Sequence, residues 1–271
     1  MSKMIVMDMD GTLLRSDGTC SEETKEYLNN LKSDGHTIVL ATGRTLRAAK
    51  LPTEDAYFAN YIITNNGALI YDVDNNDFLF KSTISKDNVK KVCSFYNQDI
   101  INFVALGTLN YYNRYSKEYF EETSQVRMIK SEDELDKLAC ETIDMTMNLK
   151  HQELIDDMIR LLNESLPELD FSVMQDSFAS KKWIRIGNDG TNKYTAIEKI
   201  ANAKGIDNND IICFGDGLND LDMLANCGLS VAMGNALDEV KVVCDDRCDT
   251  NDEDGVIRYL ERYFEYNRVM K

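Results

Sequence analysis

The chain has 271 residues, of which 43% are hydrophobic, and a formal net charge of −17. This length and composition allow one large globular domain or two smaller ones. The acidic balance argues against a nucleic-acid partner, because phosphate backbones are bound by basic surfaces and the sequence has no basic cluster. No apolar run approaches the roughly 18 residues of a membrane-spanning helix, and no cleavable apolar segment precedes Asp8. We expect a cytoplasmic protein without membrane association, either a monomer or a small homo-oligomer.

The cysteines fit that compartment. There are seven, an odd number without close pairing, which is typical of reduced thiols. Cys244 and Cys248 resemble half of a zinc site. That interpretation fails because the chain has no CxxC pair and its only histidines are His36 and His151.

The first predicted strand leads into two carboxylates. Residues 4–7 form a continuous apolar run, typical of a buried parallel strand, and Asp8, Met9, Asp10 and Gly11 follow it directly. Ligand sites of open α/β sheets lie at the carboxyl ends of such strands. Two carboxylates one residue apart repel each other by roughly 4 kcal/mol at about 4 Å, which favours a nearby cation. The alternatives for a DxD pattern alone are a solvated acidic loop, a calcium site and a glycosyltransferase.

Two further strand-and-helix units follow. Ser21 is a predicted helix N-cap, and Gly35 fits the end of that helix. A second buried strand, 37–41, ends at Thr42 and Gly43, and a helix follows to about residue 50. A third strand, 61–64, ends in two asparagines. This alternation predicts a parallel sheet with right-handed crossovers.

Residues 72–77 (DVDNND) resemble a calcium loop. They lack the glycine that such a loop needs at its sixth position and the bidentate glutamate at its twelfth. An acidic hairpin turn is therefore predicted.

The pattern changes at about residue 83. Helices are predicted at 85–97 and 152–164, and strands within 101–113, 169–174 and 181–186. Residues 143–150 alternate strictly between apolar and polar side chains, which predicts a strand with one buried face. We expect residues 83–187 to form an inserted α+β cap domain, with a hinge at residues 187–190.

The parallel pattern resumes after the insert. A helix is predicted at 192–204, a strand at 210–214 that ends in GDGLND, a short helix at 221–226, a strand at 229–233 and a last helix at 253–264. The predicted fold class is α/β, with a Rossmann-like parallel sheet core, helices on both faces and the inserted cap. Residues 1–82 and 188–271 form the core.

The polar side chains at the strand ends predict a metal-assisted phosphate site. GDGLND is not a dinucleotide loop, because Asp220 stands where the third glycine belongs, and the chain has no Walker A sequence. Asp8, Asp10, Asp216 and Asp220 converge at the strand ends, and Mg²⁺ suits such oxygen ligands. Lys193 opens a helix, where the helix dipole disfavours a cation unless an anion lies nearby.

The motifs together resemble the haloacid dehalogenase superfamily. DMDGTLL, LATGR, the Lys193 segment and GDGLNDLDML match its four motifs in order, over nearly the whole chain. GNA at 234–236, EDG at 253–255 and the long insert resemble its Cof-type subfamily, which has a cap of the C2B kind. Residues 244–247 (CDDR) depart from the pattern of the subfamily. This departure lies outside the four motifs and affects only the prediction for the edge of the sheet.

The resemblance implies a role for each motif residue. Asp8 would be the nucleophile, Asp10 the general acid and base, and Lys193 the group that offsets charge on Asp8 and on the phosphate. Met9, Thr42, Gly43 and Asn219 would contact phosphate. Asp8, Asp216 and the backbone carbonyl of Asp10 would hold Mg²⁺, with Asp220 supporting them.

These roles predict a Mg²⁺-dependent phosphatase that acts through an aspartyl-phosphate intermediate. The expected substrate is a small phosphorylated metabolite, with a sugar phosphate as the first candidate. Phosphoryl transfer depends on positioning and charge neutralisation, which this set of residues supplies. The alternatives are a phosphomutase and a non-catalytic phosphate-sensing module. A sensor would not need an acid and base at Asp10. Members of the subfamily also accept pyridoxal phosphate and flavin mononucleotide.

Overall fold

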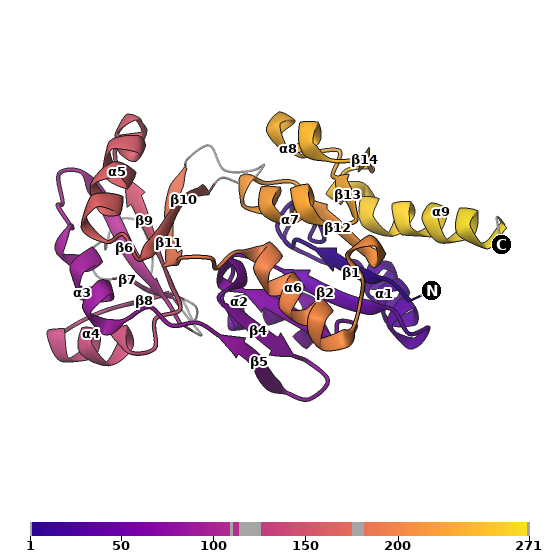
Figure 1. Cartoon of the computed structure of the whole chain (residues 1–271), viewed down its shortest axis with the longest axis horizontal. Coiled ribbons are helices and arrows are strands. Elements are labelled where there is room, and N and C mark those ends of the chain that lie inside the picture. The colour runs from indigo at the N-terminus through magenta and orange to yellow at the C-terminus, as the bar shows by residue number, and fades with distance from the viewer. Residues whose placement is uncertain (1, 109–110, 114–125, 175–181, 270–271) are drawn as a thin grey trace.

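The chain folds around two separate sheets in the computed structural model, which describes residues 2–108, 111–113, 126–174 and 182–269 (Figure 1). The larger sheet has eight strands, in the order β14 (Asp246–Arg247), β13 (Leu229–Ala232), β12 (Ile211–Gly215), β1 (Met4–Met7), β2 (Thr37–Ala41), β3 (Tyr61–Thr64), β4 (Leu69–Asp72) and β5 (Asp77–Lys81). The smaller has six, in the order β10 (Leu169–Met174), β11 (Trp183–Asn188), β9 (Asp144–Leu149), β6 (Ile101–Gly107), β7 (Tyr111–Asn113) and β8 (Val126–Met128). The predicted α/β class with an α+β insert is confirmed.

The position of β1 in the middle of the large sheet decides where Asp8 lies. β1 runs parallel to β12 on one side and to β2 on the other, with Val6 opposite both Cys213 and Val39. Residues 4–7 are completely buried, as their apolar run predicts. The strands from β14 to β3 are parallel, and β4 and β5 add an antiparallel hairpin. The acidic segment 72–77 joins these two strands, so the predicted hairpin turn is confirmed.

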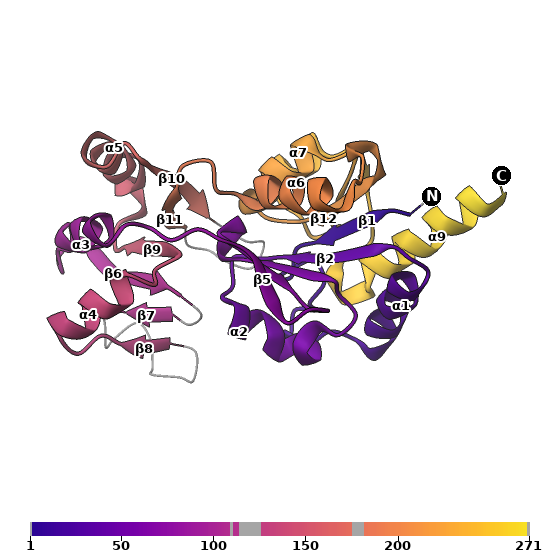
Figure 2. The ribbon, with the colours of Figure 1, turned by 60° about the horizontal axis from the view of Figure 1, so that its bottom comes forward.

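Helices cover both faces of the large sheet (Figure 2). On one face lie α6 (Lys193–Lys204) and α7 (Leu221–Asn226), with α8 (Asp238–Val243) packed against α7. On the other lie α1 (Glu22–Ser33), α2 (Leu46–Lys50) and α9 (Gly255–Val269). The predicted cap of α1 is confirmed, since Ser21 Oγ accepts from the amide of Thr24 at 3.1 Å. Around the large sheet, the short helix α8 and the two-residue edge strand β14 were not predicted; in the smaller sheet, the helix at residues 132–139 and the strand β8 were not predicted.

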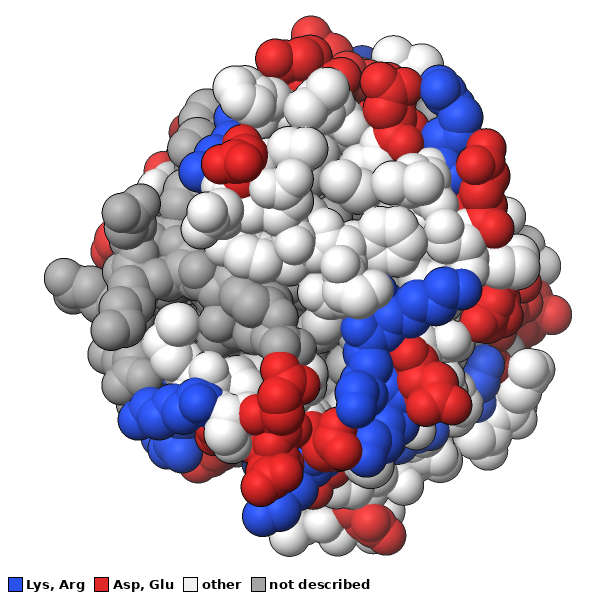
Figure 3. Space-filling view, turned by 90° about the vertical axis from the view of Figure 1, so that its left-hand side faces the viewer, with Lys and Arg blue, Asp and Glu red and all other residues white. Residues whose placement is uncertain are grey.

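The smaller sheet carries its own helices, α3 (Lys86–Ser94), α4 (Glu132–Ala139) and α5 (Ile155–Ser165), on the side away from the large sheet (Figure 2). Met145, Met147 and Ile184 pack beneath them in a second hydrophobic core. We call this unit the cap. On its outer side, described lysines and arginines stand among aspartates and glutamates (Figure 3); Lys86 and Lys90 both pair with Asp136 at 2.9 Å.

The prediction that β9 has only one buried face is wrong. Asp144 and Asn148, on its polar side, are as deeply buried as the methionines on its apolar side. The reason is that this side faces other parts of the protein. Asp144 Oδ1 accepts from Asn65 Nδ2 of the core at 2.9 Å, and Asn148 Oδ1 accepts from Asn102 Nδ2 at 2.7 Å.

The connection from cap to core differs from the predicted hinge. β11 extends to Asn188, two residues beyond the predicted strand, so Gly187 is part of the strand. Lys181, the predicted first residue of that strand, lies outside the described residues. The turn comes at Gly190, which has a φ of 70°. Asn188 Nδ2 donates to Ser82 Oγ at 2.8 Å and to the carbonyl of Thr83 at 2.9 Å, which ties the two connections together. The boundaries at residues 82 and 188 stay a prediction.

Two further findings bear on the composition. All seven cysteines are free thiols, in agreement with the reduced state expected from their number and spacing. In the part of the chain that the structure describes, no helix combines the length and apolarity needed to cross a membrane.

Candidate active site

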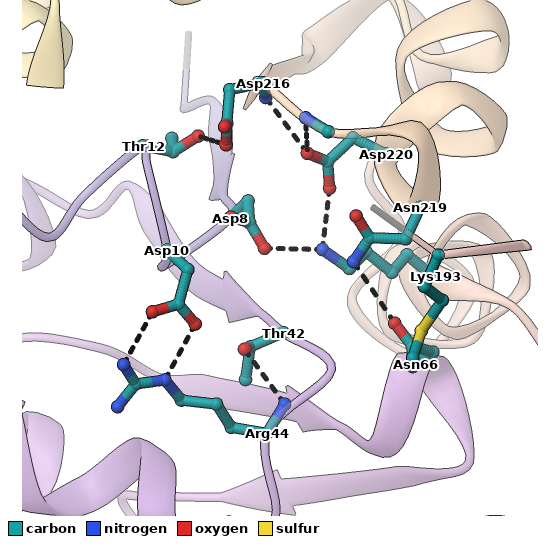
Figure 4. Close-up of polar contacts among 12 residues, drawn as sticks. Asp8, Asp10, Thr12, Thr42, Arg44, Asn66, Lys193, Asp216, Asn219 and Asp220 are labelled. Atoms are coloured by element: carbon teal, nitrogen blue, oxygen red, sulfur yellow. Dashed lines mark hydrogen bonds and ion pairs between the residues drawn. The ribbon is translucent and has the colours of Figure 1, made fainter. Parts of the chain in front are cut away.

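The loop after β1 holds Asp8 in the middle of the site, between Asp10, Asp216 and Lys193 (Figure 4). Asp8 is 5% exposed, and its amide donates to the carbonyl of Phe214 on β12 at 3.0 Å. Gly11 turns the chain with a φ of 78°. A Cβ at this position would lie 2.3 Å from Asp216 Oδ2, so only glycine lets the loop pass so close to Asp216. Thr12 Oγ1 donates to Asp216 Oδ1 at 3.0 Å.

Lys193 joins two carboxylates of the site. Its Nζ lies 2.5 Å from Asp8 Oδ1 and 2.6 Å from Asp220 Oδ1, and the side chain is 1% exposed. Burial lowers the pKa of Lys193, but the charges of Asp220 and Asp8 outweigh it and leave the pKa above its usual value. The two aspartates therefore explain the lysine at the start of α6, which the helix dipole alone would disfavour.

Asp220 has hydrogen-bond partners on both oxygens. Oδ1 accepts from Lys193, and Oδ2 accepts from the amides of Asp216 and Gly217, each at 3.0 Å. The Gly215 to Asp220 loop therefore closes on this carboxylate. The contacts suit the predicted supporting role of Asp220, which orients Lys193 and Asp216.

Asp8, Asp216 and Asp220 form a buried acidic cluster in which one oxygen of each lies within 4.8 Å of the others. Burial, and after it the charge of Asp220, raises the pKa of Asp8 well above its usual value, even though Lys193 lowers it. One ammonium thus does not balance three carboxylates. Hard carboxylate oxygens at this spacing suit a divalent cation such as Mg²⁺, so the residues present fit the predicted metal.

The side chain of Asp10 lies elsewhere. It forms a bidentate pair with Arg44, in which Nε donates to Oδ2 at 2.7 Å and Nη2 to Oδ1 at 2.6 Å. Its side chain is 40% exposed, in contrast to Asp8. The predicted metal contact through the Asp10 backbone carbonyl is untested. Arg44 belongs to the LATGR motif, but its contact with Asp10 was not predicted. The contact forms because the loops after β1 and β2 lie side by side, which the sequence does not show.

The predicted phosphate contacts lie around Lys193. Thr42 Oγ1 accepts from the amide of Arg44 at 3.1 Å, and Asn219 Nδ2 donates to Asn66 Oδ1 at 3.3 Å. A Cβ at Gly43 would come within 3.1 Å of Asn66 Oδ1, so the glycine leaves room for that amide. The side chain of Met9 is completely buried, so only its backbone is left for the predicted phosphate contact.

Two asparagines that were not assigned a role hold the Asp8 loop from behind. Asn235 Nδ2 donates to the carbonyl of Gly11 at 2.8 Å, and Asn251 Nδ2 donates to that of Leu14 at 2.8 Å. They are joined to each other, because the amide of Asn251 donates to Asn235 Oδ1 at 3.0 Å. Asn235 belongs to the GNA segment noted in the sequence, but nothing in the pattern identified its partner.

A cavity of about 260 Å³ lies between this site and the cap. Lys193, Asn219, Asn66 and Asp222 line it from the core, and Asp170, Ser172 and Arg185 line it from the cap sheet. The cap therefore forms one wall of a cavity that reaches Lys193, the partner of the predicted nucleophile Asp8; Asp8 itself does not line it. Of the four aspartates predicted to converge, Asp8, Asp216 and Asp220 form the cluster, whereas the side chain of Asp10 pairs with Arg44 instead. The roles of these residues stay predictions.

Three comparisons show that the chain as a whole is similar to known phosphatases. A family model described as haloacid dehalogenase-like hydrolase matches residues 5–260. Two Bacillus subtilis proteins named 5-amino-6-(5-phospho-D-ribitylamino)uracil phosphatase, YitU and YcsE, are each 30% identical to this chain. The alignments cover 96% of this chain in both cases and 97% and 95% of those proteins.

Solved structures of phosphatases are also similar to this chain. The phosphatase BT1666 from Bacteroides thetaiotaomicron is 25% identical with a TM-score of 0.80, over 97% of this chain and 95% of that one. The sugar phosphatase BT4131, described as subclass IIB, shares the fold with a TM-score of 0.78 at 22% identity, over 97% and 99% of the two chains. The chain therefore belongs to the haloacid dehalogenase-like hydrolases, as a Cof-type phosphatase of phosphoric monoesters.

Proposed function

We propose that the protein hydrolyses the phosphate ester of a small sugar- or polyol-type metabolite through an aspartyl-phosphate on Asp8, with Mg²⁺ as cofactor. The observation that carries this proposal is the buried Asp8 carboxylate, held 2.5 Å from Lys193 Nζ within the acidic cluster. The two relatives at 30% identity are named as phosphatases of a ribitylamino phosphate, whose phosphate is carried on a polyol chain.

In the first step an oxygen of Asp8 forms a bond to phosphorus while the ester P–O bond breaks. Lys193 offsets the charge of Asp8 and of the phosphate, and Thr42, Gly43 and Asn219 hold phosphate oxygens. A bound Mg²⁺, held by Asp8, Asp216 and the Asp10 carbonyl, would supply the positive charge that makes carboxylate attack on an anion tolerable. The leaving oxygen receives a proton from Asp10.

In the second step Asp10 takes a proton from water, the water oxygen bonds to phosphorus, and the bond between phosphorus and Asp8 breaks. Inorganic phosphate and the original Asp8 carboxylate result. Dividing hydrolysis in this way replaces one difficult step by two easier ones.

The ion pair between Asp10 and Arg44 means that the Asp10 side chain has to move during this reaction cycle. Both oxygens of Asp10 are engaged by Arg44, so Asp10 must leave that pair before it can protonate a leaving group above Asp8. Arg44 thus defines a resting position for Asp10. Cap closure over the substrate, which excludes bulk water, would be the event that releases Asp10 from Arg44.

The test is phosphate release from a panel of monoesters that includes sorbitol 6-phosphate, ribitol 5-phosphate, pyridoxal phosphate and flavin mononucleotide. Release should require Mg²⁺ and stop with excess EDTA, and it should return when Mg²⁺ is restored. Turnover that is undiminished in EDTA contradicts the proposal. A phosphomutase would move phosphate between hydroxyl groups instead of releasing it, and chromatography of the organic products separates the two reactions.

A further inference from the structure

The inner side of the cap sheet holds a buried arginine with an edge that has no partner among the described residues. Arg185 on β11 is 3% exposed and lines the cavity above Lys193. Its Nη1 donates to Asp170 Oδ2 at 3.2 Å, while Nε and Nη2 have no hydrogen-bond partner within the described part of the chain. These two nitrogens form one edge of the guanidinium, the same edge that Arg44 presents to Asp10.

A second buried group on this side is only partly engaged. Asp144 on β9 is 1% exposed, and its Oδ1 accepts from Asn65. Its Oδ2 has no partner among the residues that the structure describes. A buried polar group without a partner is costly. A donor and an acceptor left open on the same wall therefore indicate that a ligand completes them.

Two glycines make room for these side chains. A Cβ at Gly187 would lie 2.5 Å from Arg185 Nη2, and a Cβ at Gly107 would lie 1.9 Å from Asp144 Oδ1. Neither glycine has a positive φ, so backbone conformation does not require them. They are needed because any larger residue would displace the charged group beside it. The wall is thus shaped around Arg185 and Asp144.

The charges around Arg185 limit what the ligand can be. Asp170, Asp189 and Asp222 line the same cavity, and Asp144, Asp170 and Asp222 lie close enough to act on Arg185 electrostatically. Lys193, the other cation among the described residues that line the cavity, is already paired with Asp8 and Asp220. A carboxylate or a second phosphate would match the edge of Arg185 in shape. It would also add negative charge to a wall that already has more carboxylates than cations.

Building on the proposed function, we propose that Arg185 and Asp170, which line the cavity, hold the leaving group of the substrate, while the buried Asp144 adds negative charge close to Arg185. The site takes an uncharged group with acceptors for Arg185 and hydroxyl or amine donors for the aspartates, and it disfavours a second anionic group. Specificity within the monoesters would then come from the cap, while the core reads only the phosphate.

The test uses sorbitol 6-phosphate and 6-phosphogluconate, which differ only in a terminal hydroxymethyl or carboxylate group. Each is measured as a competitive inhibitor of p-nitrophenyl phosphate hydrolysis, so that binding is read whether or not the compound is turned over. Wild-type protein should bind sorbitol 6-phosphate at least about tenfold more tightly. Equal binding, or tighter binding of 6-phosphogluconate, overturns the proposal.

Substitutions of Arg185 and Asp170 test whether these cap residues cause the difference in binding. Arg185→Met should weaken sorbitol 6-phosphate about tenfold or more, while inhibition by inorganic phosphate stays within about twofold. Equal weakening of both would place Arg185 at the phosphate and overturn the proposal. Asp170→Asn, at a half-exposed position, keeps the size of the side chain and removes its charge. It should reduce the preference for sorbitol 6-phosphate over 6-phosphogluconate, and an unchanged preference would contradict the proposal. Hydrolysis of p-nitrophenyl phosphate reports the proposed core chemistry separately in every variant.

Discussion

The core wall and the cap wall of the cavity differ in how their charged groups are satisfied. In the core, Lys193 lies between Asp8 and Asp220, and Asp220 accepts two backbone amides in addition. In the cap, two nitrogens of the buried Arg185 and one oxygen of the buried Asp144 have no partner among the described residues. A site that performs the same chemistry on every substrate can be organised in advance, whereas a site that recognises one leaving group is completed by it.

The largest effect should come from the core. Asp8→Asn removes the proposed nucleophile, so kcat should fall by about 10⁴-fold or more with every substrate, p-nitrophenyl phosphate included. Steady-state kinetics measure it, and circular dichroism checks that the fold persists. Asp17→Asn, which removes one exposed carboxylate from the following loop, is the matched control and should leave kcat unchanged. If Asp8→Asn retains more than about a tenth of the activity, the core wall is not where the chemistry occurs.

Asp10 should separate the two steps of the reaction. A sugar alkoxide is a poor leaving group and needs the acid, whereas nitrophenolate needs it far less. Asp10→Asn should therefore lower kcat for sorbitol 6-phosphate by about 10²- to 10⁴-fold. With p-nitrophenyl phosphate it should give a rapid burst of nitrophenolate, about one per enzyme, followed by slow turnover. Equal slowing of both substrates without a burst would mean that Asp10 acts through structure and not as acid and base.

The smallest effect should come from the contact between the two walls. Asn65→Ala removes the donor to the buried Asp144 Oδ1 and should destabilise the protein by about 1–3 kcal/mol. It should also raise KM for sorbitol 6-phosphate with little change for p-nitrophenyl phosphate. Asn102→Ala, which breaks a hydrogen bond inside the cap, is the control. If both variants change KM alike, Asn65 has no special part in joining the cap to the site.

The core was predictable because its motifs are contiguous in sequence. An apolar run of strand length followed at once by Asp8 and Asp10 fixes both the strand and the position of the carboxylates at its end. Lys193 could be predicted to meet an anion because a lysine at a helix start needs one. The pairing of Asp10 with Arg44 could not be predicted, since it depends on the packing of two loops and on two side-chain conformations.

The cap wall was predictable only in outline. The alternation at 143–150 identified a strand, but a polar residue on a strand gives the same pattern whether it faces water or a buried site. Asp144 was therefore expected to be exposed and is buried. Arg185 belongs to no recognisable sequence motif. Its environment is set by Asp170 on the neighbouring strand β10 and by Gly187, which the sequence analysis assigned to a hinge.

The account depends most directly on phosphate becoming bonded to Asp8. Asp10→Asn protein mixed with p-nitrophenyl phosphate and Mg²⁺ should be quenched in acid within the burst, digested and analysed by mass spectrometry. The account predicts close to one phosphate per enzyme, carried on Asp8 in the peptide that spans residues 4–15, and none in Asp8→Asn protein treated in the same way. The absence of a phosphopeptide at the height of the burst, or phosphate on another residue, would contradict it.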